Sequence, residues 1–207
     1  MKSKNVFLFS QKIYIPFKYF FDFLFAFVFI IILLPFFFLI SIAVLADTKA
    51  FPIFRQKRIG KDNREFLILK FRSMNKSTPK DVPTHMLENP KDYISKFGRF
   101  IRKSSIDELP QLFNILIGQM SFIGPRPALW NQLELINERK NNHVDLLRPG
   151  LSGWAQCNGR DDIDLKQKIA LDTEYLHKFS IWFDIKIFFL SIERAIVGKD
   201  VIEGKQS

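Results

Sequence analysis

Two adjacent carboxylates, Asp107 and Glu108, are the side chains in this sequence best placed to do chemistry. Apolar residues at helical spacing predict a helix over about 108–116, namely Leu109, Leu112, Phe113 and Leu116. In one interpretation Ser105 caps this helix and Glu108 completes a capping box. In the other, Pro110 opens the helix, and the two acids precede its N-terminus, where phosphate groups bind readily. The spacing leaves both open, although a capping Ser105 would place Pro110 where its missing N–H begins to matter.

Three arginines are fixed on turns by neighbouring proline or glycine. Arg126 lies between two prolines, Arg148 precedes a Pro-Gly pair and Arg160 follows an Asn-Gly pair. An arginine on a rigid turn loses less entropy when it binds, and its fork matches phosphate oxygens. Further basic candidates are Lys70, Arg72 and Arg102. Carboxylates beside phosphate need a cation to balance their charge, so the whole set predicts phosphate chemistry assisted by Mg²⁺.

The composition narrows the kind of partner. The 207 residues include 31 Lys and Arg against 21 Asp and Glu, a formal net charge of +10. Such a chain suits nucleic acid, anionic lipid or phosphorylated substrates. The single cysteine, Cys157, excludes an internal disulfide and is interpreted as a small packed residue. The sequence has no glycine-rich nucleotide motif and no H-E-x-x-H zinc motif, and the pair Asp162 and Asp164 is interpreted as a helix cap.

An apolar run of 24 uncharged residues, 23–46, is long enough to cross a bilayer. Pro35 divides it into halves of 12 and 11 residues, and a proline inside a helix predicts a kink. Basic residues flank the run on both sides, whereas a spanning helix normally has them in excess on one side only. We therefore expect a re-entrant helix that bends at Pro35 and returns to the same face. A single-pass helix that tolerates the proline is the alternative.

The rest of the chain predicts one small, mostly helical α+β domain. Residues rich in β-formers on either side of Gly60 predict a hairpin over 50–74, and a polar stretch with several prolines predicts a loop over 75–92. Helices are expected at about 95–102, 129–141 and 164–179, with a short strand at 151–157. The apolar segment 180–197 fits a core helix or one at the membrane interface. These elements divide the chain into a membrane segment at 1–48 and a domain at 49–207.

Four ordered motifs closely resemble those of the bacterial sugar transferases, monotopic phosphoglycosyl transferases that start glycan assembly on a polyprenyl phosphate. The motifs are Lys-Phe-Arg-Ser-Met at 70–74, Asp-Glu-Leu-Pro-Gln-Leu at 107–112, Met-Ser-Phe-Ile-Gly-Pro-Arg-Pro at 120–127 and Arg-Pro-Gly-Leu-Ser-Gly-Trp-Ala-Gln at 148–156. The likeness extends over nearly the whole chain, to about residue 197. Members often carry a serine directly before the helix-breaking proline, where this chain has Leu34. The nearest hydroxyl, on Ser41, is too distant in sequence to play the same local part.

The resemblance implies transfer of a sugar-1-phosphate from a UDP-sugar to undecaprenyl phosphate, with release of UMP. Asp107 would be the nucleophile that forms a covalent phosphosugar intermediate in a ping-pong reaction, and Glu108 would hold Mg²⁺. Four basic residues match positions of the family that bind phosphates: Lys70, Arg102, Arg126 and Arg148. The predicted phosphate-binding set consists of these four residues together with Arg72, at the end of the hairpin, and Arg160, on a turn.

The resemblance also implies a place in the cell. Residues 49–207 would form a catalytic domain on the cytoplasmic face of the bacterial inner membrane, with amphipathic helices at the interface. Its partners would be the two substrates and anionic membrane lipids, without nucleic acid. The alternative from another class is a non-enzymatic, basic, membrane-anchored scaffold that binds anionic lipid or nucleic acid.

Overall fold

The structure, a computed structural model, describes residues 6–79, 93–159 and 163–197. Helices dominate this part and the strands form small sheets, so the predicted mostly helical α+β fold is confirmed. The helices are α1 (Phe9–Thr48), α2 (Lys96–Lys103), α3 (Gln111–Leu116), α4 (Leu133–Asn141), α5 (Trp154–Cys157), α6 (Leu165–Lys178) and α7 (Ile181–Val197). Short 3₁₀ turns are η1 (Lys61–Asn63), η4 (Ile106–Glu108) and η5 (Val144–Leu146).

The predicted hairpin at 50–74 is confirmed. Strands β1 (Ile53–Ile59) and β2 (Glu65–Phe71) run antiparallel, with the first residue of β1 opposite the last residue of β2. A third strand, β4 (Ala128–Leu129), pairs with the end of β1. Side chains alternate between the two faces of a strand, so this register places Arg58 and Lys70 on the same face of the hairpin.

A second, parallel sheet consists of β3 (Ser121–Ile123) and β5 (Gly150–Ser152). The strand expected at 151–157 is wrong in its second half, where the chain forms the short helix α5. The residue between β5 and α5 is Gly153, where a Cβ would lie 2.2 Å from the carbonyl oxygen of Gly124, an approach that only glycine allows. Helix α5 then buries Cys157 in the core, as predicted for this residue.

The other expected helices are confirmed, with small changes at their ends. Helix α4 begins at Leu133 and not near 129, because Ala128 and Leu129 pair with β1 as a strand. Helix α6 begins after Asp164, whose carboxylate accepts a bond of 2.7 Å from the backbone N–H of Gln167, so the predicted cap is confirmed for this residue. Of the predicted loop at 75–92, residues 80–92 lie outside the described part of the chain.

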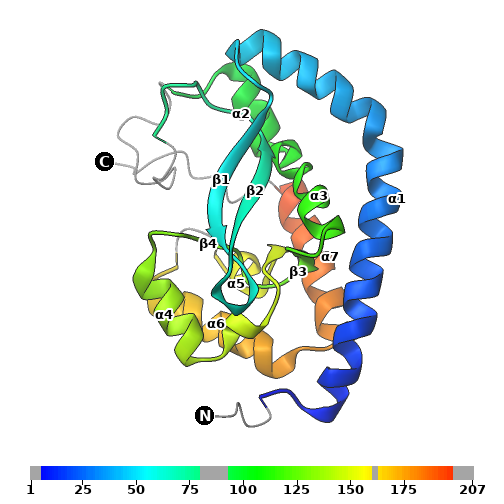
Figure 1. The fold of residues 1–207 in the computed structure, drawn as a ribbon, viewed down its shortest axis with the longest axis vertical. Coiled ribbons are helices and arrows are strands. Elements are labelled where there is room, and N and C mark those ends of the chain that lie inside the picture. The colour runs from blue at the N-terminus through cyan, green and yellow to red at the C-terminus, as the bar shows by residue number, and fades with distance from the viewer. Residues whose placement is uncertain (1–5, 80–92, 160–162, 198–207) are drawn as a thin grey trace.

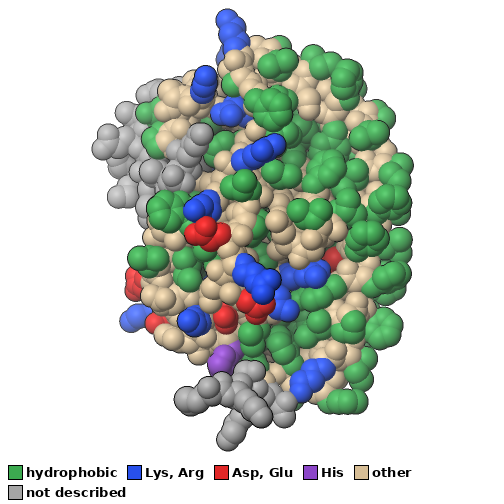
Figure 2. All heavy atoms as spheres, in the orientation of Figure 1, with side chains coloured by type: hydrophobic (Ala, Val, Ile, Leu, Met, Phe, Trp, Pro, Cys, Tyr) green, Lys and Arg blue, Asp and Glu red, His purple; other side chains and the backbone are tan. Residues whose placement is uncertain are grey.

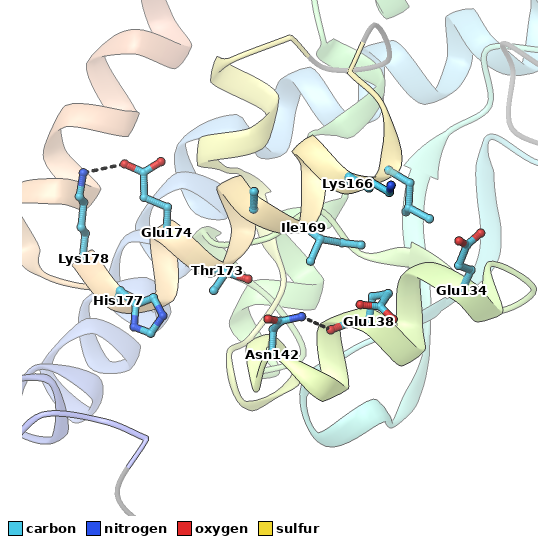
Figure 3. Close-up of a pocket in the computed structure, with 11 residues that line it drawn as sticks. Glu134, Glu138, Asn142, Lys166, Ile169, Thr173, Glu174, His177 and Lys178 are labelled. Atoms are coloured by element: carbon cyan, nitrogen blue, oxygen red, sulfur yellow. Dashed lines mark hydrogen bonds and ion pairs between the residues drawn. The ribbon is translucent and has the colours of Figure 1, made fainter.

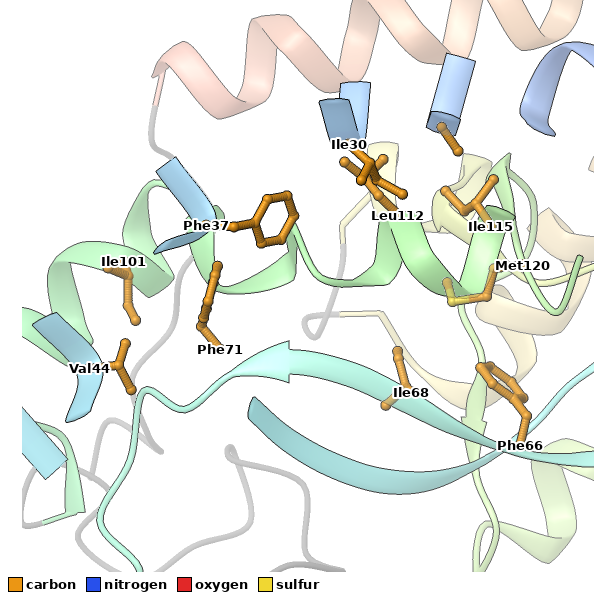
Figure 4. Close-up of a cluster of buried hydrophobic side chains, with 11 residues drawn as sticks. Ile30, Phe37, Val44, Phe66, Ile68, Phe71, Ile101, Leu112, Ile115 and Met120 are labelled. Carbon is orange, nitrogen blue, oxygen red and sulfur yellow. The ribbon is translucent and has the colours of Figure 1, made fainter. Parts of the chain in front are cut away.

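Helix α1 supplies one side of the main hydrophobic core (Figure 4). Its apolar residues in this core recur at intervals of four or seven along one face: Ala26, Ile30, Phe37 and Val44. They pack against buried side chains from β2, α2, α3 and the residue before β3: Phe66, Ile68, Phe71, Ile101, Leu112, Ile115 and Met120. The ring of Phe37 has its centre 5.6 Å from that of Phe71. The helix is therefore part of the domain core along much of its length.

Polar contacts hold both ends of α1 to the same domain. Near its N-terminus, the amide of Gln11 donates 3.1 Å bonds to two backbone carbonyls at the end of α6, and the buried Lys18 Nζ lies 2.5 Å from Asp184 Oδ2 of α7. Near its C-terminus, Asp47 accepts a bond of 2.5 Å from the hydroxyl of Ser95, the N-cap of α2. The two ends of this helix thus contact opposite ends of one compact set of elements (Figure 1).

The outward face of α1 is almost entirely apolar. The helix has 40 residues, about 60 Å at 1.5 Å per residue, and continues through Pro16 and Pro35 while bending over the domain (Figure 1). Figure 2 shows its exposed side chains as a hydrophobic band along one edge of the molecule. It is long and apolar enough to cross a membrane. The hydroxyl of Ser41 donates to the carbonyl of Phe37 at 2.7 Å, so it does not bond the carbonyl freed by Pro35.

Candidate active site

Asp107 and Glu108 lie in the turn η4, directly before α3. Ser105, at the start of this turn, has a left-handed backbone (φ 56°), and its side chain makes no capping bond. The capping-box interpretation is therefore wrong. Pro110 is the residue that immediately precedes α3, so the two acids stand before the helix, as in the alternative interpretation. The missing N–H of Pro110 costs nothing there, because the first residues of a helix have no intrahelical acceptor.

Glu108 joins a charge cluster drawn from separate parts of the chain. Its Oε1 accepts a bond of 2.6 Å from Lys70 Nζ of β2 and one of 3.2 Å from the guanidinium of Arg126, which lies between β3 and β4. Burial alone would raise the pKa of Glu108, but Lys70 and Arg126 outweigh it and hold this pKa well below its usual range. Glu108 is thus a permanent anion that aligns two cations of the predicted set.

Asp107 is buried beside this cluster, with 7% of its surface exposed. Burial, with a further contribution from Glu108, raises the pKa of Asp107 to about 6, although Lys70 favours its charged form. The carboxylate is then ionised for the most part at neutral pH, yet it is more basic than an ordinary aspartate. A buried, unusually basic carboxylate among cations is suited to attack on an electrophile that carries negative charge.

Arg58 is a cation of this site that the sequence reasoning missed. Its guanidinium donates to the carbonyl of Pro127 at 3.0 Å and, through two nitrogens, to the side-chain oxygen of Gln56 at 3.1 and 2.7 Å. Burial and the nearby charge of Arg126 lower the pKa of Arg58 to about 9 against the opposing effect of Glu108, so the group lies within electrostatic reach of both. The alternation of the predicted hairpin, which puts it on the face of Lys70, is the signal that could have found it.

The other predicted basic residues differ in where they lie. Arg102, in the last turn of α2, acts on Asp107 as a nearby positive charge. The guanidinium of Arg148 lies 3.7 Å from the ring centre of Tyr19, a cation–π contact with α1. The structure therefore brings Arg102 to the acids and places Arg148 against α1. Arg160 lies outside the described residues.

Arg72 lies at the open end of the hairpin. Its Nε donates to the carbonyl of Phe51 at 3.0 Å, and its guanidinium lies 5.8 Å from the ring centre of Phe54. It points to the same face of the hairpin as Lys70 but is two residues later in the chain, just beyond the end of β2. These contacts indicate a role in fixing the hairpin.

We therefore expect Arg72→Ala and Lys70→Ala to differ sharply. Removal of Lys70 should lower turnover about 100-fold, because Glu108 loses its shortest charged bond and the site loses a cation that is only 15% exposed. Removal of Arg72 should lower turnover less than about threefold, because its bond is exposed to water. Equal losses in a transfer assay on the two purified variants would contradict this placement.

The donor set fits Mg²⁺, although no cage of three or more His, Cys, Asp or Glu forms within the described residues. Mg²⁺ keeps several waters and commonly takes one or two carboxylates together with substrate phosphates. Asp107 and Glu108 are a carboxylate pair of this kind, and both bonds to Glu108 described above go to Oε1. A magnesium ion shared between this pair and a diphosphate is therefore compatible with the site.

A cavity of about 790 Å³ lies in another part of the fold, between α4 and α6 (Figure 3). Its walls carry both charged and apolar side chains, among them Glu138, Lys166, Ile169 and His177. None of the residues that line it belongs to the predicted site. The acid pair and its cations are thus separate from this cavity.

Comparison with known proteins identifies the class of protein to which this fold and this site belong. The chain belongs to the bacterial sugar transferase family, whose family model matches residues 13–198. It is 39% identical over 176 residues to an undecaprenyl-phosphate glucose phosphotransferase of Komagataeibacter xylinus. It is 37% identical over 167 residues to a UDP-glucose:undecaprenyl-phosphate glucose-1-phosphate transferase of Escherichia coli (strain K12), and 38% identical over 164 residues to an uncharacterized sugar transferase, EpsL, of Bacillus subtilis (strain 168).

These relatives differ in how much of their length the chain spans. The matches cover 80%, 77% and 79% of this chain. They cover 33% and 36% of the two named glucose transferases, against 79% of EpsL. The chain therefore spans about a third of the larger relatives and most of the smaller one.

Proposed function

We propose that this protein transfers a sugar-1-phosphate from a UDP-sugar to undecaprenyl phosphate at the membrane surface. The observation that carries the proposal is the buried Asp107 next to a Glu108 that Lys70 and Arg126 hold in place. The names of the two larger relatives support it, since each describes transfer of glucose or glucose phosphate to undecaprenyl phosphate. Family membership and the site chemistry thus favour the same reaction.

The reaction begins with Asp107. A carboxylate oxygen of Asp107 forms a bond to the sugar-proximal phosphorus while the phosphoanhydride bond breaks, and UMP leaves with the electron pair. A phosphate oxygen of undecaprenyl phosphate then attacks the aspartyl phosphosugar, forms the new diphosphate and returns Asp107 to its free carboxylate. Mg²⁺ held by Glu108 would neutralise charge on the diphosphate. Lys70 and Arg126 would hold phosphate oxygens close to the nucleophile.

The charge of the site supports this assignment. Four cations, Lys70, Arg58, Arg102 and Arg126, lie around two carboxylates, so positive charge exceeds negative by two. Arg58, Lys70 and Arg102 are partly buried and Arg126 is 44% exposed, so water screens part of their mutual repulsion; a bound dianion relieves what remains. The diphosphate of a nucleotide sugar is such a dianion. An anion attacks an anionic phosphorus slowly unless fixed cations offset the charge, as this site does.

Release of UMP tests the proposal. The purified protein should release UMP over many turnovers from one member of a UDP-sugar panel when undecaprenyl phosphate and Mg²⁺ are both present, and at most one equivalent when the lipid is absent. Such release would also identify the sugar. Binding of anionic lipid or nucleic acid without any release, by protein shown to be folded, would favour the non-enzymatic scaffold.

The proposal includes a re-entrant α1 on the cytoplasmic face of the inner membrane. What supports re-entry is that Gln11 and Asp47, near opposite ends of the helix, both contact the same domain. A straight span would carry one end away from the domain across a core of about 30 Å. The apolar outward face of α1 and the bend in its course are also compatible with insertion from one side (Figures 1 and 2).

Cysteine labelling tests the topology. We expect Lys12→Cys and Lys49→Cys, each in a Cys157→Ala background, to react with an impermeant maleimide only from the cytoplasmic side. Inside-out vesicles should therefore label at both positions and intact spheroplasts at neither. Phe36→Cys, next to Pro35 and outward-facing, is the control and should be protected from both sides. Labelling of the two lysine positions from opposite sides would show a spanning helix.

A further inference from the structure

Arg126 belongs to a segment that cannot hold itself in place by ordinary pairing. It lies between Pro125 and Pro127, and each proline lacks the N–H that a strand or helix would use. The segment nevertheless has to present the Arg126 guanidinium to Glu108 at 3.2 Å. A long, flexible side chain reaches such a distance reproducibly only when its backbone is fixed.

Three consecutive carbonyls of this segment are each bound by a donor from a different element. The backbone N–H of Gly150 in β5 donates to the carbonyl of Pro125 at 2.9 Å. Arg139 of α4 donates to the carbonyl of Arg126 at 2.8 Å. Arg58 of β1 donates to the carbonyl of Pro127 at 3.0 Å. The backbone on either side of the Arg126 side chain is therefore held from separate directions.

Arg139 is held in place by a buried partner on α6. It is 8% exposed, and its Nε and one terminal nitrogen donate to Asp172 Oδ2 of α6 at 3.0 and 2.6 Å. Asp172 is 1% exposed, and burial raises its pKa against the effect of Arg139. The carboxylate fixes one edge of the planar guanidinium, which leaves the other terminal nitrogen directed at the carbonyl of Arg126.

Arg58 is fixed in a similar way by a neutral partner. Gln56, which is 9% exposed and two residues earlier on the same strand face, accepts from two nitrogens of Arg58. The remaining terminal nitrogen meets the carbonyl of Pro127. Each arginine thus uses one edge of its fork for a buried partner and one nitrogen for the segment that carries Arg126.

We infer that Arg58 and Arg139 are positioning residues for Arg126: they fix the backbone from which Arg126 reaches Glu108 and the substrate phosphate. This inference rests on the proposed function for its kinetic consequence. The ion pair between Arg139 of α4 and Asp172 of α6 is remote in sequence from the two acids. We expect it to affect the rate of the reaction through the side chain of Arg126.

A double-mutant cycle tests the inference in full-length protein. Arg139→Lys keeps the charge that Asp172 needs but loses the fork that reaches the Arg126 carbonyl. We expect it to lower kcat about 10- to 100-fold in the wild-type background. In an Arg126→Ala background it should lower kcat less than about threefold, because the residue that it positions is already gone. Lys140→Arg, at the exposed next position on α4, is the matched control and should leave both backgrounds unchanged.

A purely structural role predicts another outcome. Arg139→Lys would then lower activity by the same factor in both backgrounds, and that result would overturn the inference. Arg58→Lys provides a second, independent cycle with the same expectation. Failure of both variants to fold, judged by Tm, would also overturn it, since the two arginines would then support the whole domain and not one segment.

Backbone exchange provides a readout that does not depend on activity. In Arg139→Lys, amide hydrogen exchange at residues 124–130 should rise several-fold while exchange in α7 stays unchanged. A uniform rise, or none, would contradict the positioning role. An inactive wild type with the local rise would instead contradict the proposed function alone, so the two failures can be told apart.

Discussion

Replacement of Asp107 by asparagine is expected to lower turnover by about 10⁴-fold or more and to leave the fold intact. Asparagine has nearly the same shape, but its amide oxygen is a poor nucleophile and cannot form the proposed aspartyl phosphosugar. The side chain is buried, and its carboxylate is already destabilised by that burial, so a neutral group of the same size should be tolerated. UMP release and thermal unfolding measured on the same preparation check both parts.

The matched control is Asp164→Asn, the same chemical change at the N-cap of α6. Asparagine caps helices as well as aspartate does, so this variant should keep its activity within about twofold. Near-normal turnover in Asp107→Asn, from protein free of wild type, would show that another group attacks the phosphorus. A large fall in Tm would show that Asp107 serves the fold.

Replacement of Glu108 by glutamine should have the next largest effect, a fall in turnover of about 10²- to 10³-fold. Glutamine can still accept a bond through Oε1, but it no longer balances the charges of Lys70 and Arg126, which lie 2.6 and 3.2 Å from that oxygen in the wild type. The two cations then repel each other and lose their alignment. If Glu108 also holds Mg²⁺, the Mg²⁺ concentration that gives half-maximal activity should rise about tenfold or more.

A titration of activity with Mg²⁺ separates these two effects. The comparison variant is Glu134→Gln, an exposed residue of α4 outside the charge cluster, which should match the wild type in both rate and Mg²⁺ requirement. A slow Glu108→Gln enzyme with an unchanged Mg²⁺ requirement would leave the charge role and contradict the metal role. Wild-type behaviour in both respects would contradict the whole assignment of Glu108.

The sequence predicted the features that depend on local signals. The hairpin follows from β-formers on both sides of a Gly-Lys-Asp-Asn turn, and the acid pair stands before α3 because of Pro110. The choice between the two interpretations of Ser105 required the backbone, since a left-handed residue leaves no trace in spacing. The strand predicted over 151–157 failed at Gly153 because short apolar runs fit a strand and a helix equally.

The site was predicted in part. Lys70, Arg102 and Arg126 gather around Asp107 and Glu108 as expected; all but Arg102 belong to the first three of the four motifs. Lys70 and Arg72 are two residues apart and therefore point to the same face of the hairpin. The sequence alone could not tell them apart, because what distinguishes them is that β2 ends between them and that η4 packs near Lys70. The guanidinium of Arg148 instead packs on the ring of Tyr19 in α1, a contact between segments more than a hundred residues apart that the sequence does not reveal.

Arg139 shows what such reasoning misses. It stands in a helix with many polar residues, and its partner Asp172 comes 33 residues later on another helix. Charges in such helices are mostly solvated, and nothing in the spacing marks this pair as buried. Only the packing of α4 on α6 reveals that one guanidinium links the pair to the backbone of Arg126.

The most direct test of the central claim is the mass of the protein after exposure to its UDP-sugar in the presence of Mg²⁺ and the absence of undecaprenyl phosphate. We expect one added sugar phosphate on the peptide that contains Asp107. The adduct should disappear on addition of undecaprenyl phosphate and be absent from Asp107→Asn. Turnover without any such adduct, with UMP released only when both substrates are bound, would contradict a covalent aspartyl intermediate.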